Sequence, residues 1–357
     1  MRDPLEQKFK AYYDKFLVRG RVVFRYLSRL LIFYQTGTLP AQFKSTVKRS
    51  QLRSFNMVLI PQIQRSGGSL LSQLFDGHPE VWSYPLEFTG IKCGIGRHPY
   101  FQRKRDPFSY LDLWLYHLRE GVYKKIGSAG KALNKDEICT PKFHFSMKLY
   151  RRVFNKHRKG VKNKSFRSFM DVYFSAMYES ILSQKRYVGL KYVCAFSPRA
   201  LSVERDMDLF VDAYPDGKVI WIIRDPFTWY ASAKKHSSRY SDLERSMGEW
   251  SENVKAALKM RAKYHEHIRL INFSSLLIDT SSTMAHLARF LQITFSERLL
   301  VPTFNNEMLT NDSSYEVTQG VVNKAPIENR LSHLTEDEKL KLESRASRFV
   351  IKEICDF

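Results

Sequence analysis

The sequence predicts a single α/β domain with a central parallel sheet flanked by helices. Short apolar runs alternate with segments of helical periodicity through the second half of the chain, which is the rhythm of strand–helix–strand units. An earlier apolar run ends in a turn rich in Ser and Gly and leads into another helical pattern. With 357 residues, 43% of them hydrophobic, the chain is long enough to bury one large core.

The net charge of the chain indicates the kind of partner it binds, and its cysteines indicate the cellular compartment. A formal net charge of +22 indicates an anionic partner, which can be a nucleotide, an acidic glycan, a membrane surface or a nucleic acid. The cysteines form no C-x-x-C pair, so neither a zinc site nor a disulfide framework is expected. Free thiols and an N-terminus without a secretory signal pattern favour the cytoplasm. The cysteines are Cys93, Cys139, Cys194 and Cys355.

Residues 1–54 are predicted to form a basic helix and linker ahead of a main domain at residues 55–357. Helical periodicity extends over residues 5–35, with Arg21, Arg25 and Arg29 along one face. Such a helix can lie on an anionic membrane or pack on the domain with its Arg face in water, and the pattern leaves both open. Its apolar block is too short and too charged to span a bilayer, which needs about 20 apolar residues. A basic linker is expected over residues 44–53.

The main domain begins with a strand, a loop and a helix. The apolar run at residues 57–60 predicts a buried strand, and the helix after the loop is predicted from Leu70, Leu71, Leu74 and Phe75. Gly67 and Gly68 let successive backbone N–H groups turn inward at a helix N-terminus, where the helix dipole favours an anion. The loop therefore predicts a phosphate or sulfate site, similar to a P-loop, made by Arg65, Ser66, Gly67, Gly68, Ser69 and Leu70.

A short strand at residues 81–84 is followed by an irregular stretch at about residues 90–165, dense in Arg, Lys and aromatic residues. A helix is predicted within it at residues 110–119. Long insertions between core elements are usually functional or mobile, so this one is interpreted as an acceptor-binding surface or as a solvated basic loop.

The second half returns to alternating elements and then closes with helices. The predicted strands are residues 187–193, 218–223 and 267–273, and the predicted helices are residues 166–182, 199–213, 226–236, 242–264, 281–291 and 336–354.

A second anion-binding element is expected where the strand at residues 218–223 ends. Arg224 follows that strand, at the edge where ligands bind in open α/β sheets. Ser232 comes eight residues later, about two helical turns on, so both side chains can reach one anion. The alternative is a plain helix start, in which Asp225 caps and Pro226 fills the first turn.

Taken together, the motifs resemble those of sulfotransferases that use 3′-phosphoadenosine 5′-phosphosulfate (PAPS). The loop is similar to the family's Pro-Arg/Lys-Ser-Gly-Thr-Thr/Ser, although Gln64 replaces Pro and Gly68 replaces the first Thr, which removes one hydroxyl donor. Arg224 and Ser232 match the element that binds the 3′-phosphate, and Lys324 matches a late basic residue. The resemblance covers roughly residues 55–90 and 185–340, and is nearer to the bacterial, Golgi and tyrosylprotein branches than to the cytosolic one.

The resemblance implies a transfer of a sulfuryl group from PAPS to an acceptor hydroxyl of a glycan, a lipid or another compound, with adenosine 3′,5′-bisphosphate (PAP) as product and without a metal. Arg65 is the implied catalytic cation. Glu87 is the first candidate for the base and His144 its rival, while Glu87 can also be explained by a salt bridge.

Two other functions compete with sulfuryl transfer. A P-loop phosphotransferase is disfavoured because the loop lacks the Lys that a Walker A sequence places before its last hydroxyl. A non-catalytic protein that binds nucleic acid or membrane is supported only by charge and by aromatics between Arg and Lys. A nucleic-acid partner is therefore not expected, whereas peripheral membrane contact through the N-terminal helix stays open.

Overall fold

The computed structural model describes residues 41–85, 87–88, 137–139, 144–163, 165–181, 187, 189–198, 200–308, 317–318, 321–322, 331–346 and 354–356. The chain divides into two compact units, Met1–Arg49 and Ser50–Phe357. In the first unit, helix α2 (Ala41–Arg49) occupies most of the stretch predicted as a linker, which corrects that prediction. Lys48 and Arg49 in its last turn favour the helix because they complement its dipole. The helix predicted over residues 5–35 lies outside the described residues.

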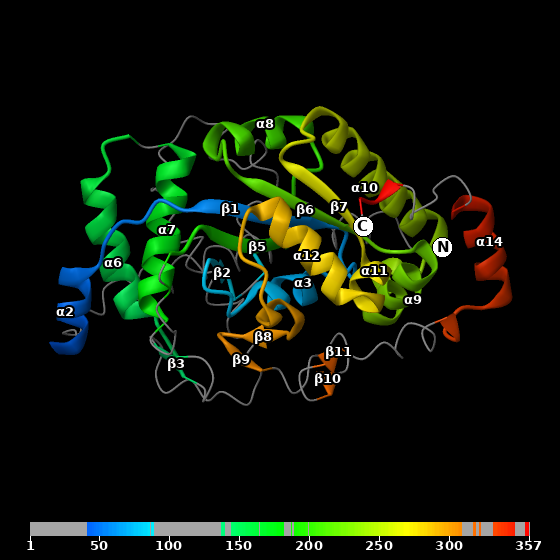
Figure 1. Ribbon diagram of the computed structural model, residues 1–357. Helices are drawn as coiled ribbons and strands as arrows, with labels where there is room; N and C mark the ends of the chain where they lie inside the picture. The colour runs from blue at the N-terminus through cyan, green and yellow to red at the C-terminus, as the bar shows by residue number, and fades with distance from the viewer. Residues whose placement is uncertain are drawn as a thin grey trace, which may run out of the picture. The chain divides into compact units, whose positions relative to one another are not determined.

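The second unit is built on a five-stranded sheet in the order β2-β5-β1-β6-β7 (Figure 1). Every pairing in it is parallel. The strands are β1 (Asn56–Gln62), β2 (Val81–Ser83), β5 (Tyr192–Pro198), β6 (Lys218–Ile223) and β7 (Ile268–Asn272). The predicted α/β fold with a central parallel sheet is confirmed.

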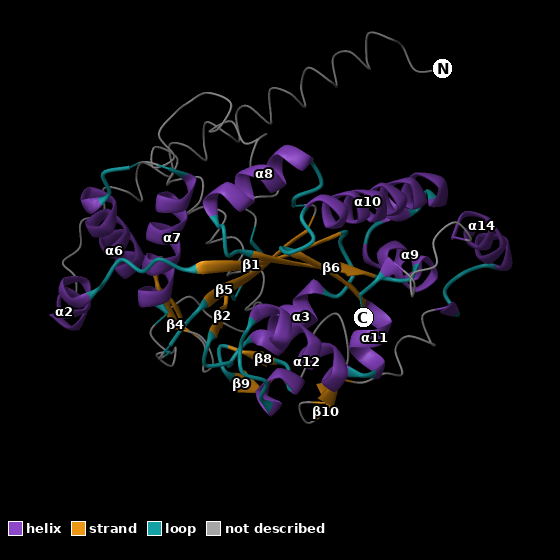
Figure 2. Cartoon of the chain, turned by 45° about the horizontal axis from the view of Figure 1, so that its top comes forward, coloured by secondary structure: helices purple, strands orange, loops and turns teal. Residues whose placement is uncertain are grey.

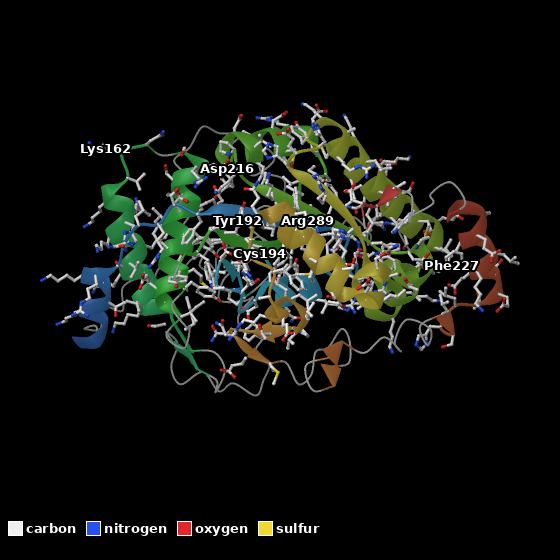
Figure 3. All side chains as sticks on the ribbon, in the orientation of Figure 1. Lys162, Tyr192, Cys194, Asp216, Phe227 and Arg289 are labelled. Carbon is white, nitrogen blue, oxygen red and sulfur yellow. The ribbon has the colours of Figure 1, made fainter. Side chains whose placement is uncertain are left out.

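Helices cover both faces of this sheet, as Figure 2 shows. On one face lie α3 (Gly68–Phe75), α11 (Phe273–Ile278) and α12 (Thr280–Leu291), whose apolar side chains form one buried cluster with alternate residues of the strands. On the other lie α8 (Glu204–Ala213) and α10 (Leu243–Lys263). Burial on both faces explains why the strands are apolar runs and not alternating patterns. Cys194 is fully buried in β5 (Figure 3).

The remaining elements surround this core. They are helices α6 (Met147–Gly160), α7 (Phe166–Ser180), α9 (Pro226–His236), α14 (Glu336–Ala346), η3 (Ser238–Tyr240) and η4 (Glu297–Leu300), and the paired strands β3 (Glu137–Cys139) with β4 (His144–Ser146), β8 (Thr303–Phe304) with β9 (Glu307–Met308), and β10 (Val317–Thr318) with β11 (Val321–Val322).

Helix α6 corrects the prediction that residues 90–165 are irregular. Its Leu149, Tyr150, Val153 and Phe154 are all fully buried, while its exposed side carries Arg and Lys. The Ser146 side chain caps the helix by accepting from the Leu149 N–H at 3.3 Å. The apolar residues of this helix recur at helical spacing, but the many basic residues between them made the pattern difficult to recognise in the sequence. The predicted helix at residues 110–119 lies outside the described residues.

Strand β5 begins five residues later than predicted, at Tyr192. Gly189 has φ of 80°, in the left-handed region that interrupts a strand. Helix α8 also begins late, at Glu204, because Leu201 has φ of 56° and the Ala200 N–H closes a turn on the Ser197 carbonyl. By contrast, β6 and α9 have the predicted bounds.

Candidate functional site

The candidate site lies where β1 and β6 end. Because these two parallel strands are neighbours in the sheet, the loop after β1 and the turn after β6 share one edge (Figure 1). The first carries the anion-binding loop, residues 63–67, and the second carries Arg224. The two predicted elements, 159 residues apart in sequence, are joined directly, because Nη1 of Arg224 donates to the Arg65 carbonyl at 3.0 Å.

The loop turns sharply into α3. Gly67 is the residue before the helix and has φ of 106°. A Cβ at this position would lie 2.2 Å from the ring of Phe273, so both the backbone angle and the space require glycine. The backbone N–H groups of Ser69 and Leu70 donate to no group in the described part of the chain. They remain available to an anion at the start of α3.

Ser66 is the residue that best fits a phosphate or sulfate. Its side chain is fully buried, and its Oγ has no hydrogen-bond partner among the described residues. A buried hydroxyl without a partner costs free energy, commonly about 1–3 kcal/mol, unless a ligand satisfies it. The residues present therefore fit an anionic group in this loop.

One expectation about the loop is corrected. The N–H of Gly68 does not turn toward an anion, because it donates to Oε1 of Gln62 at 2.6 Å. Gln62 is the last residue of β1 and is almost fully buried. Its side chain thus takes one of the backbone donors that the two glycines were expected to provide.

Arg65 connects the loop to α9. Its Nε donates to Oγ of Ser232 at 3.4 Å, across 167 residues of sequence. The Arg65 backbone has φ of 73°, a left-handed conformation that is uncommon for residues other than glycine. Such strain is often found at functional sites, where the surrounding structure imposes it.

Arg224 is only 2% exposed and is held on several sides. Its Nε donates to Oγ1 of Thr228 at 3.2 Å, and its guanidinium lies 4.8 Å from the ring centroid of Phe273. Its carbonyl accepts from Nε1 of Trp250 at 3.0 Å. Arg224 therefore supports the Arg65 backbone as well as placing a positive charge at the sheet edge.

Gln64, which departs from the family's Pro, has its own anchors. Its carbonyl accepts from Nε1 of Trp229 at 2.8 Å, and its side-chain Oε1 accepts from the hydroxyl of Tyr240 at 3.0 Å. The Trp229 and Tyr240 rings meet edge to face at 5.9 Å. Sequence reasoning missed both aromatic residues, although Trp229 comes soon after the Arg-Asp-Pro turn, whereas Tyr240 lies in η3 beyond the end of α9.

His236 was also missed. It lies one helical turn after Ser232 on α9. Partial burial, together with the positive charge of Arg65, lowers the pKa of this imidazole below its ordinary value. Because the charge of Arg65 contributes to this lower pKa, His236 lies near the candidate site.

Glu87 lies at the same edge of the sheet, beside β5. The N–H groups of Tyr84 and Phe88 donate to the carbonyls of Cys194 and Phe196, each at 2.8 Å, and the Phe88 carbonyl accepts from Oγ of Ser197 at 2.6 Å. Through these contacts the segment from Tyr84 to Phe88 lies along the C-terminal part of β5, which is the neighbour of β1. Glu87 is half-buried there.

Two other candidate site residues, His144 and Lys324, lie partly or wholly outside the described residues. The backbone of His144 opens β4, which pairs with β3 in a separate two-stranded sheet, and its side chain is outside the described residues. Lys324 also lies outside the described residues.

A cavity of about 920 Å³ opens between α8 and α10 and reaches Ile63 at the start of the loop. Charges of both signs line it, and several are paired: Arg239 with Glu249 at 3.1 Å and Lys259 with Glu204 at 2.8 Å. Within the described ranges, no group of three His, Cys, Asp or Glu side chains is arranged to hold a metal ion. No helix there combines the length and apolar character needed to cross a membrane.

The comparison with protein families identifies the class. A sequence model described as "Sulfotransferase family" matches residues 58–297, more than half of the 357-residue chain. With its α/β fold, the chain is thus a transferase. It belongs to the sulfotransferase family.

The chain is also similar to solved structures. The sulfotransferase domain from the curacin biosynthetic pathway shares 13% identity, with 83% of this chain and 98% of that chain covered and a TM-score of 0.48. The sulfotransferase domain from the Synechococcus PCC 7002 olefin synthase shares 14% identity, with 84% and 98% covered and a TM-score of 0.46. Mouse sulfotransferase SULT7A1 complexed with PAP shares 8% identity, with 86% and 89% covered and a TM-score of 0.38. A comparison with curated protein sequences finds no match.

Proposed function

We propose that the protein transfers a sulfuryl group from PAPS to an acceptor hydroxyl. The observation that carries the proposal is the buried hydroxyl of Ser66, which has no partner among the described residues and lies in a loop tied to α9 through Arg65 and Ser232. Two cations at one sheet edge, Arg65 and Arg224, suit a nucleotide with anionic groups at both ends.

The residues divide into two groups around that nucleotide. At its 5′ end, the hydroxyls of Ser66 and Ser69 and the backbone N–H groups of Ser69 and Leu70 donate to the phosphosulfate. Gly67 allows the close turn between them. At its 3′ end, Arg224 and Ser232 bind the phosphate, and Lys324 is proposed as a third ligand there.

The proposed chemistry depends mainly on position and charge. PAPS, when bound, supplies an activated sulfuryl group on a phosphate leaving group. Arg65 stabilises the negative charge that develops beside the loop, as cations do in phosphoryl transfer. Glu87 receives the proton of the acceptor hydroxyl, and His144 is the alternative base.

The acceptor is proposed to be a glycan, a lipid or another hydroxyl compound. The basic stretch at residues 90–165 favours an anionic or sugar acceptor, and most of it lies outside the described residues. We also propose a cytoplasmic location, from the free thiols. Contact with an anionic membrane through the N-terminal helix is a further proposal, and deletion of residues 15–34 followed by vesicle binding tests it.

The test of this function is a transfer assay with radiolabelled PAPS and a panel of glycan, lipid, peptide and small-alcohol acceptors. We expect label in one acceptor class, and loss of that label when Arg65 is replaced by Ala. Transfer of phosphate from labelled ATP, with none from PAPS, would instead support a phosphotransferase. Binding to nucleic acid without any transfer would support the non-catalytic alternative.

A further inference from the structure

We infer that Gln62 replaces the missing side chain of residue 68 as a hydrogen-bond donor to the 5′ phosphosulfate. This inference rests on the proposed function. It concerns a residue outside the loop motif, at the end of β1, and it explains how the loop tolerates glycine where a hydroxyl residue is usual in the family.

The carboxamide of Gln62 fills the space beside Gly68. An ideal Cβ built on Gly68 would lie 2.6 Å from Nε2 of Gln62 and 2.7 Å from its Cδ and Oε1. Real Cβ atoms do not approach other atoms so closely, so the carboxamide of Gln62 occupies the volume into which a side chain at residue 68 would extend. The carboxamide of Gln62 therefore supplies a polar group at the position where a side chain of residue 68 would lie.

The orientation of the carboxamide follows from its hydrogen bond. The Gly68 N–H can only donate, so the atom that faces it at 2.6 Å must be the oxygen. This fixes Nε2 as the other end of the group. Gln62 is 4% exposed, and its Nε2 donates to no acceptor in the part of the chain that the structure describes. Nε2 is not one of the fully buried donors without a partner, so it keeps some contact with solvent and is accessible to a ligand that carries an acceptor.

The location suits the ligand. The carboxamide lies against Gly68, the first residue of α3, and the next two residues, Ser69 and Leu70, have available N–H groups. The backbone of Gln62 is fixed because it pairs with Pro198 of β5 within the sheet. A donor on a rigid strand needs little reordering to bind, which favours affinity.

The first experiment removes the donor and keeps the acceptor. Gln62→Glu retains an oxygen for the Gly68 N–H but puts a negative oxygen in place of Nε2. We expect its affinity for PAP, measured by titration calorimetry, to fall at least tenfold, with thermal unfolding that shows a folded protein. Gln62→Ala should weaken PAP binding by roughly ten- to a hundredfold for the same reason.

The second experiment restores the donor by another route. Gly68→Ser alone forces its side chain against Gln62 and should lower both stability and PAP affinity. The double variant Gln62→Ala with Gly68→Ser opens the space and places a hydroxyl at residue 68, so PAP affinity should return to within a few-fold of the natural chain. The matched control, Gln62→Ala with Gly68→Ala, fills the same space without a donor and should stay weak.

The outcomes separate this inference from the proposed function. If the natural chain binds PAP and folded Gln62→Ala and Gln62→Glu bind it equally well, the inference is overturned and the proposed function stands. If the Ser and Ala double variants bind PAP alike, Gln62 acts by packing, which also overturns it. If the natural chain does not bind PAP, the proposed function and the inference both fail.

Discussion

Nε of Arg65 lies 3.4 Å from Oγ of Ser232, which joins the loop after β1 to the helix after β6. The sequence assigns these residues to two anion-binding elements, and the resemblance to sulfotransferases implies that these elements hold the two ends of one nucleotide. Their contact shows that the two elements adjoin, which is consistent with the proposal that they hold one nucleotide. Perturbing either residue should therefore affect recognition of one ligand and not of two.

Ser232→Ala should weaken binding of PAP by about ten- to a hundredfold, because a hydrogen bond to a charged phosphate is lost. Binding of adenosine 5′-monophosphate, which has no 3′-phosphate, should change little. Calorimetric titration with both nucleotides measures the difference, and Ser238→Ala, an exposed serine in η3, is the control. An equal loss for both nucleotides would mean that Ser232 does not contact the 3′-phosphate.

Arg65→Gly should distinguish the effect of the side-chain charge on PAP binding from the effect of the backbone strain on stability. The left-handed backbone at residue 65 costs a non-glycine residue about 1–2 kcal/mol, and glycine removes that cost. We expect Arg65→Gly to be at least as stable as the natural chain toward urea, yet to bind PAP much more weakly. Arg65→Ala, which keeps the strain, should be less stable than Arg65→Gly. A large loss of stability in Arg65→Gly would show that the side chain mainly holds the fold.

Glu87→Gln keeps the shape of the side chain and removes the base. Sulfuryl transfer should fall by about 10²–10⁴-fold while the affinity for PAP is preserved. Glu266→Gln, on an exposed turn, should leave the rate unchanged. Near-normal transfer by Glu87→Gln, combined with loss of transfer in His144→Ala, would assign the role to His144.

The stability of the domain should depend on pH through His157 of α6. Burial, and then the charge of Lys156, lower the pKa of this imidazole to about 4 from its ordinary 6.5. Between these values the unfolded chain binds a proton that the folded chain does not, so stability should fall as the pH drops from about 6.5 to 4, by on the order of 3 kcal/mol.

Urea unfolding at several pH values measures this dependence. His157→Phe should reduce this dependence, whereas His265→Gln, on an exposed turn, should leave it in place. An unchanged slope in His157→Phe would contradict the assignment.

Local signals were enough to predict β6 and α9. The apolar run that forms β6 is followed by Asp225, whose side chain accepts from the N–H groups of Phe227 and Thr228 at 3.0 and 3.1 Å, and by Pro226 in the first turn. Because the strand signal, the cap and the proline agree, the boundary could be assigned without knowledge of tertiary contacts.

Tertiary contacts decide the features that sequence reasoning missed. Strand β5 ends in Ser197 and Pro198, which are weak strand formers, but both residues pair with the end of β1. The carboxamide of Gln62 reaches the loop only through the fold of residues 62–68, and a pattern of residue types does not reveal that approach.

The most direct test of a PAPS-type nucleotide at this sheet edge is calorimetric titration of the natural chain with PAP and, separately, with ADP. We expect PAP to bind with one-to-one stoichiometry and at least tenfold more tightly than ADP, because Arg224 and Ser232 favour a 3′-phosphate. Equal affinity for the two nucleotides, or no binding of PAP, would contradict the proposed function.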